Sequence, residues 1–363
     1  LRQAEQEIVE KQSEVDRHLS DMRKWYRRKL RELARGREAG GAGESKPPDR
    51  DILQITGDVS PADQQLGDLL RSLDLVDAET LTALLIEAHR QRRSLRQLLL
   101  AGNYLTLFQM ALIEAGDLDG LVRGPVRVID RIQASSRELA YRVFDPRGNR
   151  EALLRHLAED EMQDAVRPDE FRQRFMAAAQ LQHPHVQSTF EVLDINERPA
   201  CLQEWLHGVP SNDWPDLASV PGVWYRLFTQ AALGLSAIHQ AGLVHGNLHA
   251  EQFILTHEGN LKICGLGEPL WLSPLSPSED SDLEADLRAL GRIGREWLTI
   301  GQGSKRKSKP MPESILELLS QLCGETEEPI GSAELVEALQ ERGAEVPGNP
   351  TAWQRFLKAI RED

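Results

Sequence analysis

Apolar residues recur every seven positions at the beginning of the chain, and this spacing predicts a coiled-coil helix over residues 1–36. One heptad position is apolar at four successive repeats, Leu1, Ile8, Val15 and Met22. The second position is apolar only in the later half, because Glu5 and Gln12 occupy it earlier. The pattern predicts self-association through residues 1–36, with a single solvated helix as the alternative.

A second helical pattern follows a segment rich in Gly, Ser and Pro, which predicts a linker over residues 37–63. The stretches 75–88 and 104–115 resemble each other, and Asp77 and Thr106 precede their apolar runs as expected for helix caps. We therefore expect a small helical module over residues 64–121, with a role in packing or in docking another protein.

Composition narrows the class of protein. The 363 residues are 40% hydrophobic, which is sufficient for the cores of two or three folded units. Three scattered cysteines in apolar contexts indicate buried thiols in a reducing, cytoplasmic compartment. No run of about 18 apolar residues occurs, so no membrane span is expected. The net charge of -14 argues against DNA as the main partner.

The stretch GLVHGNLHAEQFILTHEGNLKICGLGEPL, residues 242–270, resembles the catalytic and metal-binding loops of protein kinases. The family's framework residues are matched, among them His245. At the chemical positions the chain differs from the family. Asn247 replaces the catalytic Asp, His249 the loop Lys, Gln252 the metal-binding Asn and Gly265 the metal-binding Asp.

The resemblance extends to residues 124–157, which align with the first three strands of bacterial Ser/Thr kinases. The loop 133–138 lacks the glycines that let backbone N–H groups approach phosphates. The family's Lys becomes Arg155 and its paired helix Glu becomes Arg174. Two such cations about 4 Å apart would repel by roughly 4 kcal/mol, so we expect a rearranged lobe or an anion between them.

Other segments match parts that serve architecture in the family. Residues 199–208 resemble the hinge, with Gln203 at the gatekeeper position and a vestigial adenine contact at Glu204, Trp205 and Leu206. In residues 284–298, Asp286 matches the family's Asp that ties down the backbone of the catalytic loop. His245 and Asp286 are therefore expected to have structural roles. The resemblance implies an α+β, two-lobed kinase-like fold over residues 122–345, preceded by the helical module and the coiled coil. A helical tail over residues 346–363 is expected to follow.

The missing chemical groups favour a catalytically inactive pseudokinase, not an enzyme, that acts as a protein-interaction or regulatory scaffold for an unidentified protein partner. This hypothesis expects no cofactor and no metal. One alternative is a divergent nucleotide-dependent transferase, in which Glu251 or Glu268 is a displaced metal ligand. Another is a metal-independent sensor that binds an anion through Arg155 or Arg174, because an Arg side chain can engage phosphate.

Overall fold

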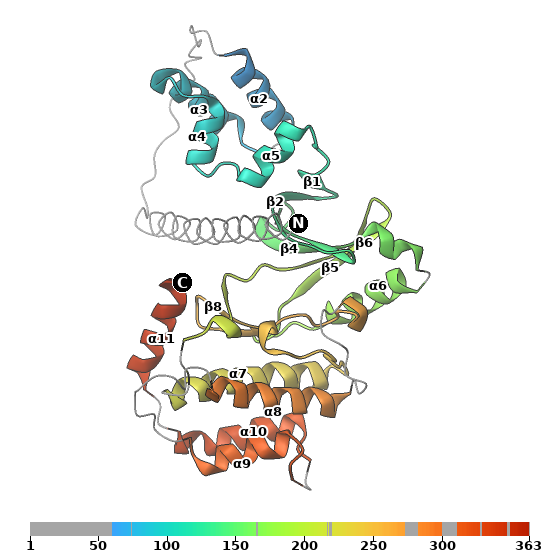
Figure 1. The fold of residues 1–363 in the computed structure, drawn as a ribbon, viewed down its shortest axis with the longest axis vertical. Helices are drawn as coiled ribbons and strands as arrows, with labels where there is room; N and C mark the ends of the chain where they lie inside the picture. The colour runs from blue at the N-terminus through green and yellow to red at the C-terminus, as the bar shows by residue number, and fades with distance from the viewer. Residues whose placement is uncertain are drawn as a thin grey trace, which may run out of the picture. The chain divides into compact units, whose positions relative to one another are not determined.

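The computed structural model describes residues 60–362 except residues 74, 165, 216, 218–219, 273–281, 300–310, 327–328 and 347–348 (Figure 1). The described residues from 60 to 357 belong to one compact unit. The predicted coiled coil over residues 1–36 lies outside the described residues. Among the described helices, none combines the length and apolar character needed to cross a membrane.

The helical module contains α2 (Pro61–Ser72), α3 (Ala78–Gln91), α4 (Leu95–Ala101) and α5 (Leu107–Ala115). The two sequence patterns fall on α3 and α5. As predicted, the Asp77 side chain caps α3 by accepting from the N–H of Thr80, and Thr106 caps α5 by accepting from the N–H of Gln109. The four helices enclose a core of Leu70, Val76, Leu81, Leu95, Leu99, Leu105 and Met110.

A six-stranded antiparallel sheet follows, in the order β1-β2-β3-β4-β6-β5. Its strands are β1 (Val122–Arg123), β2 (Val126–Ala134), β3 (Glu138–Asp145), β4 (Arg150–Leu157), β5 (Thr189–Ile195) and β6 (Arg198–Glu204). Alternate residues of these strands point into one apolar core, which includes Val128, Val143, Leu154 and Leu202. Helix α6 (Arg167–Ala178) contacts β5 and β6.

The rest of the kinase-like region is mainly helical. Helix α7 (Pro221–Gln240) packs against α8 (Leu283–Thr299) and α10 (Ser332–Arg342), and α8 also packs against α9 (Glu313–Leu322). The predicted apolar residues Leu227, Ala231, Leu235 and Ile238 of α7 are fully buried. A small sheet of β7 (Gly208–Pro210), β8 (Phe253–Thr256) and β9 (Leu261–Ile263) carries the loops that match the kinase motifs. Helix α11 (Pro350–Glu362) follows.

The protein therefore has the α+β, two-lobed kinase-like fold that the sequence predicts, with an antiparallel sheet lobe followed by a helical lobe. Five 3-10 helices complete the described elements: η1 (Glu159–Gln163), η2 (Ser211–Asp213), η3 (Ala250–Gln252), η4 (Leu270–Leu272) and η5 (Gly343–Glu345). Two of them flank the candidate site. The η3 turn follows the catalytic-loop segment, and η4 follows the metal-loop segment.

Candidate active site

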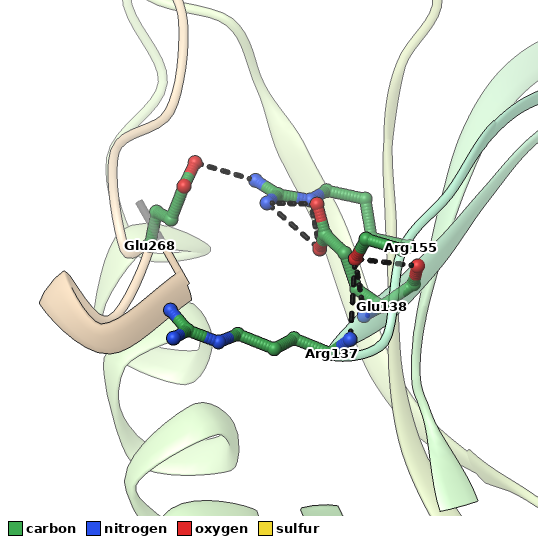
Figure 2. Close-up of polar contacts among 5 residues, drawn as sticks. Arg137, Glu138, Arg155 and Glu268 are labelled. Carbon is green, nitrogen blue, oxygen red and sulfur yellow. Dashed lines mark hydrogen bonds and ion pairs between the residues drawn. The ribbon is translucent and has the colours of Figure 1, made fainter. Parts of the chain in front are cut away.

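Arg155 on β4 is bound by two carboxylates, as Figure 2 shows. Its Nε and Nη2 atoms donate to Glu138 Oε2 and Oε1 at 3.0 and 2.9 Å, and its Nη1 atom donates to Glu268 Oε2 at 3.0 Å. Burial alone would lower the pKa of Arg155, but the charges of Glu138 and Glu268 outweigh burial and raise it. The protein itself thus supplies the negative charges that balance Arg155, through Glu138 and Glu268.

Glu138 occupies the position of the last glycine of the family's phosphate loop. The loop before it is a turn built on Ser135, whose Oγ accepts from the N–H groups of Arg137 and Glu138 at 3.2 and 3.0 Å. The turn delivers the Glu138 side chain to Arg155 on the neighbouring strand. Two departures from the family pattern thus compensate each other, one at the glycine position and one at the lysine position.

Arg174 on α6 makes no ion pair with another described residue, and its buried Nε atom has no hydrogen-bond partner there. The helix is instead held by neighbouring residues. Arg172 binds Asp194 at 2.8 Å, and Glu170 Oε2 accepts from the Trp271 indole N–H at 2.7 Å. Arg155 and Arg174 therefore do not reproduce the Lys-Glu contact of the family, which agrees with the repulsion expected between them.

The catalytic-loop backbone is tied to α8 through Asp286, which is 2% exposed. Its Oδ2 and Oδ1 atoms accept from the backbone N–H groups of His245 and Gly246 at 2.8 and 2.9 Å. His239 Nε2 lies 3.2 Å from Oδ2. The His245 ring in turn contacts the carbonyl oxygen of Cys264 at 2.8 Å. These bonds join the catalytic-loop segment to the metal-loop segment.

Two side chains fill the space where Gly265 lacks one. A Cβ atom on Gly265 would lie 2.5 Å from Gln252 Nε2 and 3.6 Å from Glu268 Oε2. Gln252 is 7% exposed and the Glu268 side chain is 13% exposed. Gly265 and Gly267 have φ values of +82° and +87°, and the Glu268 N–H donates to the Gly265 carbonyl at 3.0 Å. This turn brings the Glu268 side chain back to the Gly265 position.

Glu268, one of the two carboxylates that the sequence offers as a displaced metal ligand, therefore lies beside the Gly265 position. Glu251, the other candidate, is exposed and accepts from Asn212 Nδ2 at 3.2 Å. Glu268 offers a carboxylate here, whereas Gln252 turns its Nε2 atom toward the Gly265 position and uses its Oε1 atom to accept from the His249 N–H. One protein carboxylate beside phosphate oxygens is compatible with Mg²⁺, which commonly takes one or two protein oxygens and shares the rest with its substrate. Within the described part of the chain, no group of three or more His, Cys, Asp or Glu residues with metal-binding geometry occurs.

His249 and Asn247 lie in the loop before η3, and both are half-buried. The His249 N–H donates to Gln252 Oε1 at 3.3 Å, which ties the loop to the Gly265 position. Burial lowers the pKa of the His249 ring, although Glu251 and Glu268 oppose the shift. The imidazole is consequently neutral at pH 7 and able to accept a proton.

The hinge residues predicted from sequence lie at the end of β6. The Glu204 carboxylate accepts from Lys262 Nζ at 2.7 Å and from the Ser188 N–H at 3.2 Å, so it faces the protein. Trp205 stacks under Arg142, whose guanidinium carbon is 5.4 Å from the ring centre, and Leu206 is half-buried. Gln203 is 1% exposed and donates to Thr189 Oγ1 at 3.0 Å.

The segment after Glu268 is anchored to the sheet lobe by residues that the sequence did not single out. Arg137 Nη1 donates to the Trp271 carbonyl oxygen, and Trp271 also lies beneath Arg167, at 5.1 Å from the ring centre. Leu272 enters an apolar cluster with Leu157, Phe171, Phe175 and Cys201. Figure 2 shows the Arg137 side chain running toward the segment that carries Glu268.

Comparison with known proteins supports the resemblance. The chain is 21% identical over 204 residues to the probable serine/threonine-protein kinase pknA2 of Bifidobacterium longum, covering 49% of this chain and 27% of that protein. It is 27% identical over 158 residues to the serine/threonine-protein kinase Pkn1 of Myxococcus xanthus, covering 36% of this chain and 23% of that protein. The chain thus spans about a quarter of these relatives. No protein-family model matches.

Sequence similarity thus supports placing the chain in the protein kinase-like superfamily. Among solved structures, the kinase domain of Mycobacterium tuberculosis PknI is similar with a TM-score of 0.48 at 18% identity, over 62% of this chain and 98% of that domain. Both of these relatives are named as serine/threonine-protein kinases. This finding contradicts the interpretation of the chain as a catalytically inactive scaffold and non-enzyme, which rested on missing family residues alone.

Proposed function

We propose that the kinase-like region is a nucleotide-dependent phosphotransferase with a rearranged metal and phosphate site. The observation that carries the proposal is the position of Glu268, whose Oε2 atom lies 3.6 Å from the Cβ site of Gly265 beside Gln252. In the family, the metal-binding Asp projects from the Gly265 position. A carboxylate from three residues later thus supplies the missing charge, and the kinase names of the aligned relatives support the same reading.

Glu268 is the residue that would hold Mg²⁺, in exchange for the bond that its Oε2 atom accepts from Arg155 Nη1. When bound, Mg²⁺ neutralises charge on the phosphate oxygens of the substrate. Arg155 is the cation beside this position, and its guanidinium already binds two carboxylates. A nucleotide phosphate would take the place of one of them, because the planar fork of an Arg side chain binds phosphate and carboxylate in the same way.

His249 would accept the proton of the attacking hydroxyl, since its ring is neutral at pH 7. Asn247 would orient that hydroxyl, because an amide offers hydrogen bonds but no basic charge. Proton removal is a modest part of phosphoryl transfer, in which positioning and charge stabilisation dominate. The change from Asp to Asn at residue 247 is therefore compatible with transfer at a reduced rate.

The experiment measures transfer of labelled γ-phosphate from ATP to the chain itself and to a Ser/Thr-rich unfolded protein, with and without Mg²⁺. Glu268→Gln should lower the Mg²⁺-dependent rate by about a hundredfold, the scale reported for losing one electrostatic contact to a transition state. Glu258→Gln makes the same chemical change at an exposed residue and should leave the rate unchanged. A wild-type chain with neither Mg²⁺-dependent ATP binding nor phosphate transfer would overturn the proposal.

The remaining proposals concern assembly and location. Residues 1–36 are proposed to mediate self-association through their heptads, and the 64–121 module is proposed to be part of the same functional unit. A reducing, cytoplasmic location is supported by Cys201, Cys264 and Cys323, which are free thiols.

A further inference from the structure

The side chains that cap α5 also bind the first long strand of the kinase-like region. Thr106 Oγ1 accepts from the Gln109 N–H at 3.1 Å and donates to the Ile129 carbonyl oxygen at 2.6 Å. Gln109 Oε1 accepts from the Thr106 N–H at 2.9 Å, while its Nε2 donates to the Val128 carbonyl oxygen at 2.7 Å. Each side chain therefore serves as a helix cap and as a donor to β2.

The two carbonyls lie at an irregularity in β2. Val128 pairs with Val143 and Asp130 with Arg142, so Ile129 is an extra residue without a partner on β3. Such a bulge leaves ladder groups unpaired and bends the strand. On the other side of β2, β1 pairs only with Val126 and Arg127. The capping side chains of α5 thus satisfy β2 carbonyls at the place where strand pairing is interrupted.

Apolar packing reinforces these hydrogen bonds. Phe108, which lies between the two donors in sequence, packs against the core of the six-stranded sheet. The guanidinium carbon of Arg131 lies 5.8 Å from the Phe108 ring centre. Gln109 is 7% exposed, so its donor to Val128 is protected from water. Leaving a buried carbonyl without a donor is unfavourable, which makes this contact selective for its present geometry.

The clamped strand ends at the candidate active site. Beyond Ile129, β2 continues to Ala134, has a second register shift between Arg131 and Gln133, and enters the turn that delivers Glu138. Glu138 binds Arg155 through two guanidinium nitrogens. Only one short turn separates the end of β2 from Glu138, which binds Arg155. A displacement of β2 would therefore also displace Glu138.

We propose that Thr106 and Gln109 are positioning residues, through which the helical module holds the β2 bulge and so fixes the Glu138-Arg155 pair. The clamp itself rests on the contacts described above. Its effect on nucleotide use rests on the proposed phosphotransferase function. The module at residues 64–121 then acts on the kinase-like region as a built-in support for the phosphate-binding turn.

Two substitutions separate capping from clamping in the full chain. Gln109→Glu keeps the acceptor for the Thr106 N–H but loses the donor to Val128. Thr106→Asp keeps a good N-cap acceptor but loses the donor to Ile129, because an ionised carboxylate only accepts. Thr106→Ser keeps both functions and is the matched control. Substitutions at two positions keep the test decisive if one variant does not fold.

Hydrogen exchange tests the clamp without reference to activity. Amides of residues 129–138 should exchange about tenfold faster in Gln109→Glu and Thr106→Asp, the scale of one lost hydrogen bond, while Thr106→Ser matches wild type. Exchange rates of the α5 amides should stay within about twofold of wild type, since the cap of α5 is retained. Those of α8, which is remote from the clamp, should do the same. Unchanged exchange at 129–138 in both variants, or equal acceleration in α5, would overturn the clamp.

Kinetics then tests the link to the site. The KM for ATP should rise about fivefold in Gln109→Glu and Thr106→Asp, because binding of the phosphates in the ground state is weakened. The kcat of both variants should stay within about twofold of wild type. Faster exchange at 129–138 with an unchanged KM would overturn the positioning role. If wild type neither binds nor uses ATP, the phosphotransferase proposal and the positioning role that rests on it both fail, whereas the exchange result still decides the clamp.

Discussion

Glu138 and Arg155 form a two-pronged ion pair across the β3–β4 hairpin, with Nε–Oε2 and Nη2–Oε1 distances of 3.0 and 2.9 Å. Both side chains are 9% exposed. The pair joins β3 to β4, one turn after β2, the strand that the helical module contacts, and it lies beside the Glu268 carboxylate. It therefore connects the sheet lobe to the segment that carries Glu268.

Glu138→Gln should destabilise the fold strongly. Arg155 would keep Glu268 but lose its bidentate partner, and removing one member of a buried ion pair typically costs about 3 to 5 kcal/mol. Urea unfolding measures the change. Glu151→Gln is the control, because Arg142 also binds the Glu151 carboxylate through two guanidinium nitrogens. In this pair the Arg142 side chain is 18% exposed and the Glu151 side chain is 33% exposed. A partly exposed pair contributes about 1 kcal/mol or less. Equal losses in the two variants would contradict the special role of Glu138.

The Glu138-Arg155 contact was within reach of sequence reasoning. In the β3–β4 hairpin Ala140 pairs with Arg155, so Glu138 lies two residues away on the same face, the diagonal position of an antiparallel pair. Counting the register outward from the turn at residues 145–150 would have placed a carboxylate beside the Arg. The missing glycines of the loop, taken alone, give no sign of this contact.

Glu268 was not predictable in the same way. Its position depends on positive φ values at Gly265 and Gly267, and the pattern of residues does not reveal whether a glycine adopts such values. The helix caps and the α7 core positions, by contrast, follow from short-range periodicity and were predicted. Reasoning from sequence therefore succeeded for local patterns and failed where a turn reverses the direction of a side chain.

Asp286→Ala should lower stability more than a surface substitution does. The Asp286 carboxylate accepts from two backbone N–H groups, those of His245 and Gly246, and contacts His239. Leaving buried donors unpaired costs about 1 to 3 kcal/mol. Glu284→Ala removes an exposed carboxylate from the same helix and is the control. The expected result is a clearly lower melting temperature for Asp286→Ala alone, and an unchanged value would mean that these bonds do not hold the loop.

The pH dependence of transfer tests His249. Because burial lowers the pKa of this ring below the ordinary histidine value of 6.5, the neutral, proton-accepting form persists at pH 6.5 and is lost only in more acidic solution. Transfer should therefore decline on the acid side below pH 6.5, and His249→Gln should remove this decline while lowering the rate at neutral pH.

Stability must be followed in parallel with that profile. A His whose pKa is lowered in the folded state binds fewer protons in the folded chain than in the unfolded chain. Its contribution to the stability of the fold therefore falls as the pH drops below the pKa of the His in the unfolded chain. Circular dichroism at each pH gives the folded fraction used for correction. If the transfer rate, corrected for the folded fraction, declines at acid pH to the same extent in wild type and in His249→Gln, another group accepts the proton.

Leu272→Ala should open the apolar cluster around Cys201. Cys201 is fully buried against Leu157, Phe171, Phe175 and Leu272, and burial raises the pKa of its thiol, so it should react slowly with thiol reagents. Removing the Leu272 side chain takes away the apolar contact of this segment with α6 and leaves a cavity beside the thiol, while the bond from Trp271 to Glu170 remains. The rate of Cys201 labelling, followed on the peptide that contains Cys201 by mass spectrometry, should rise by about tenfold or more. The reason is that loss of the Leu272 contact lowers the free energy needed for local opening around the thiol.

The control for this change is Leu318→Ala on α9, which removes the same atoms from a buried site outside the Cys201 cluster. Both substitutions should cost about 2 to 5 kcal/mol of global stability, so labelling through global unfolding would accelerate in both. Labelling through local release of the 270–272 segment would accelerate only in Leu272→Ala. Equal acceleration in the two variants would show that this segment does not open independently, and that Arg137, Glu170 and the Leu272 cluster hold it as firmly as the core of the helical lobe.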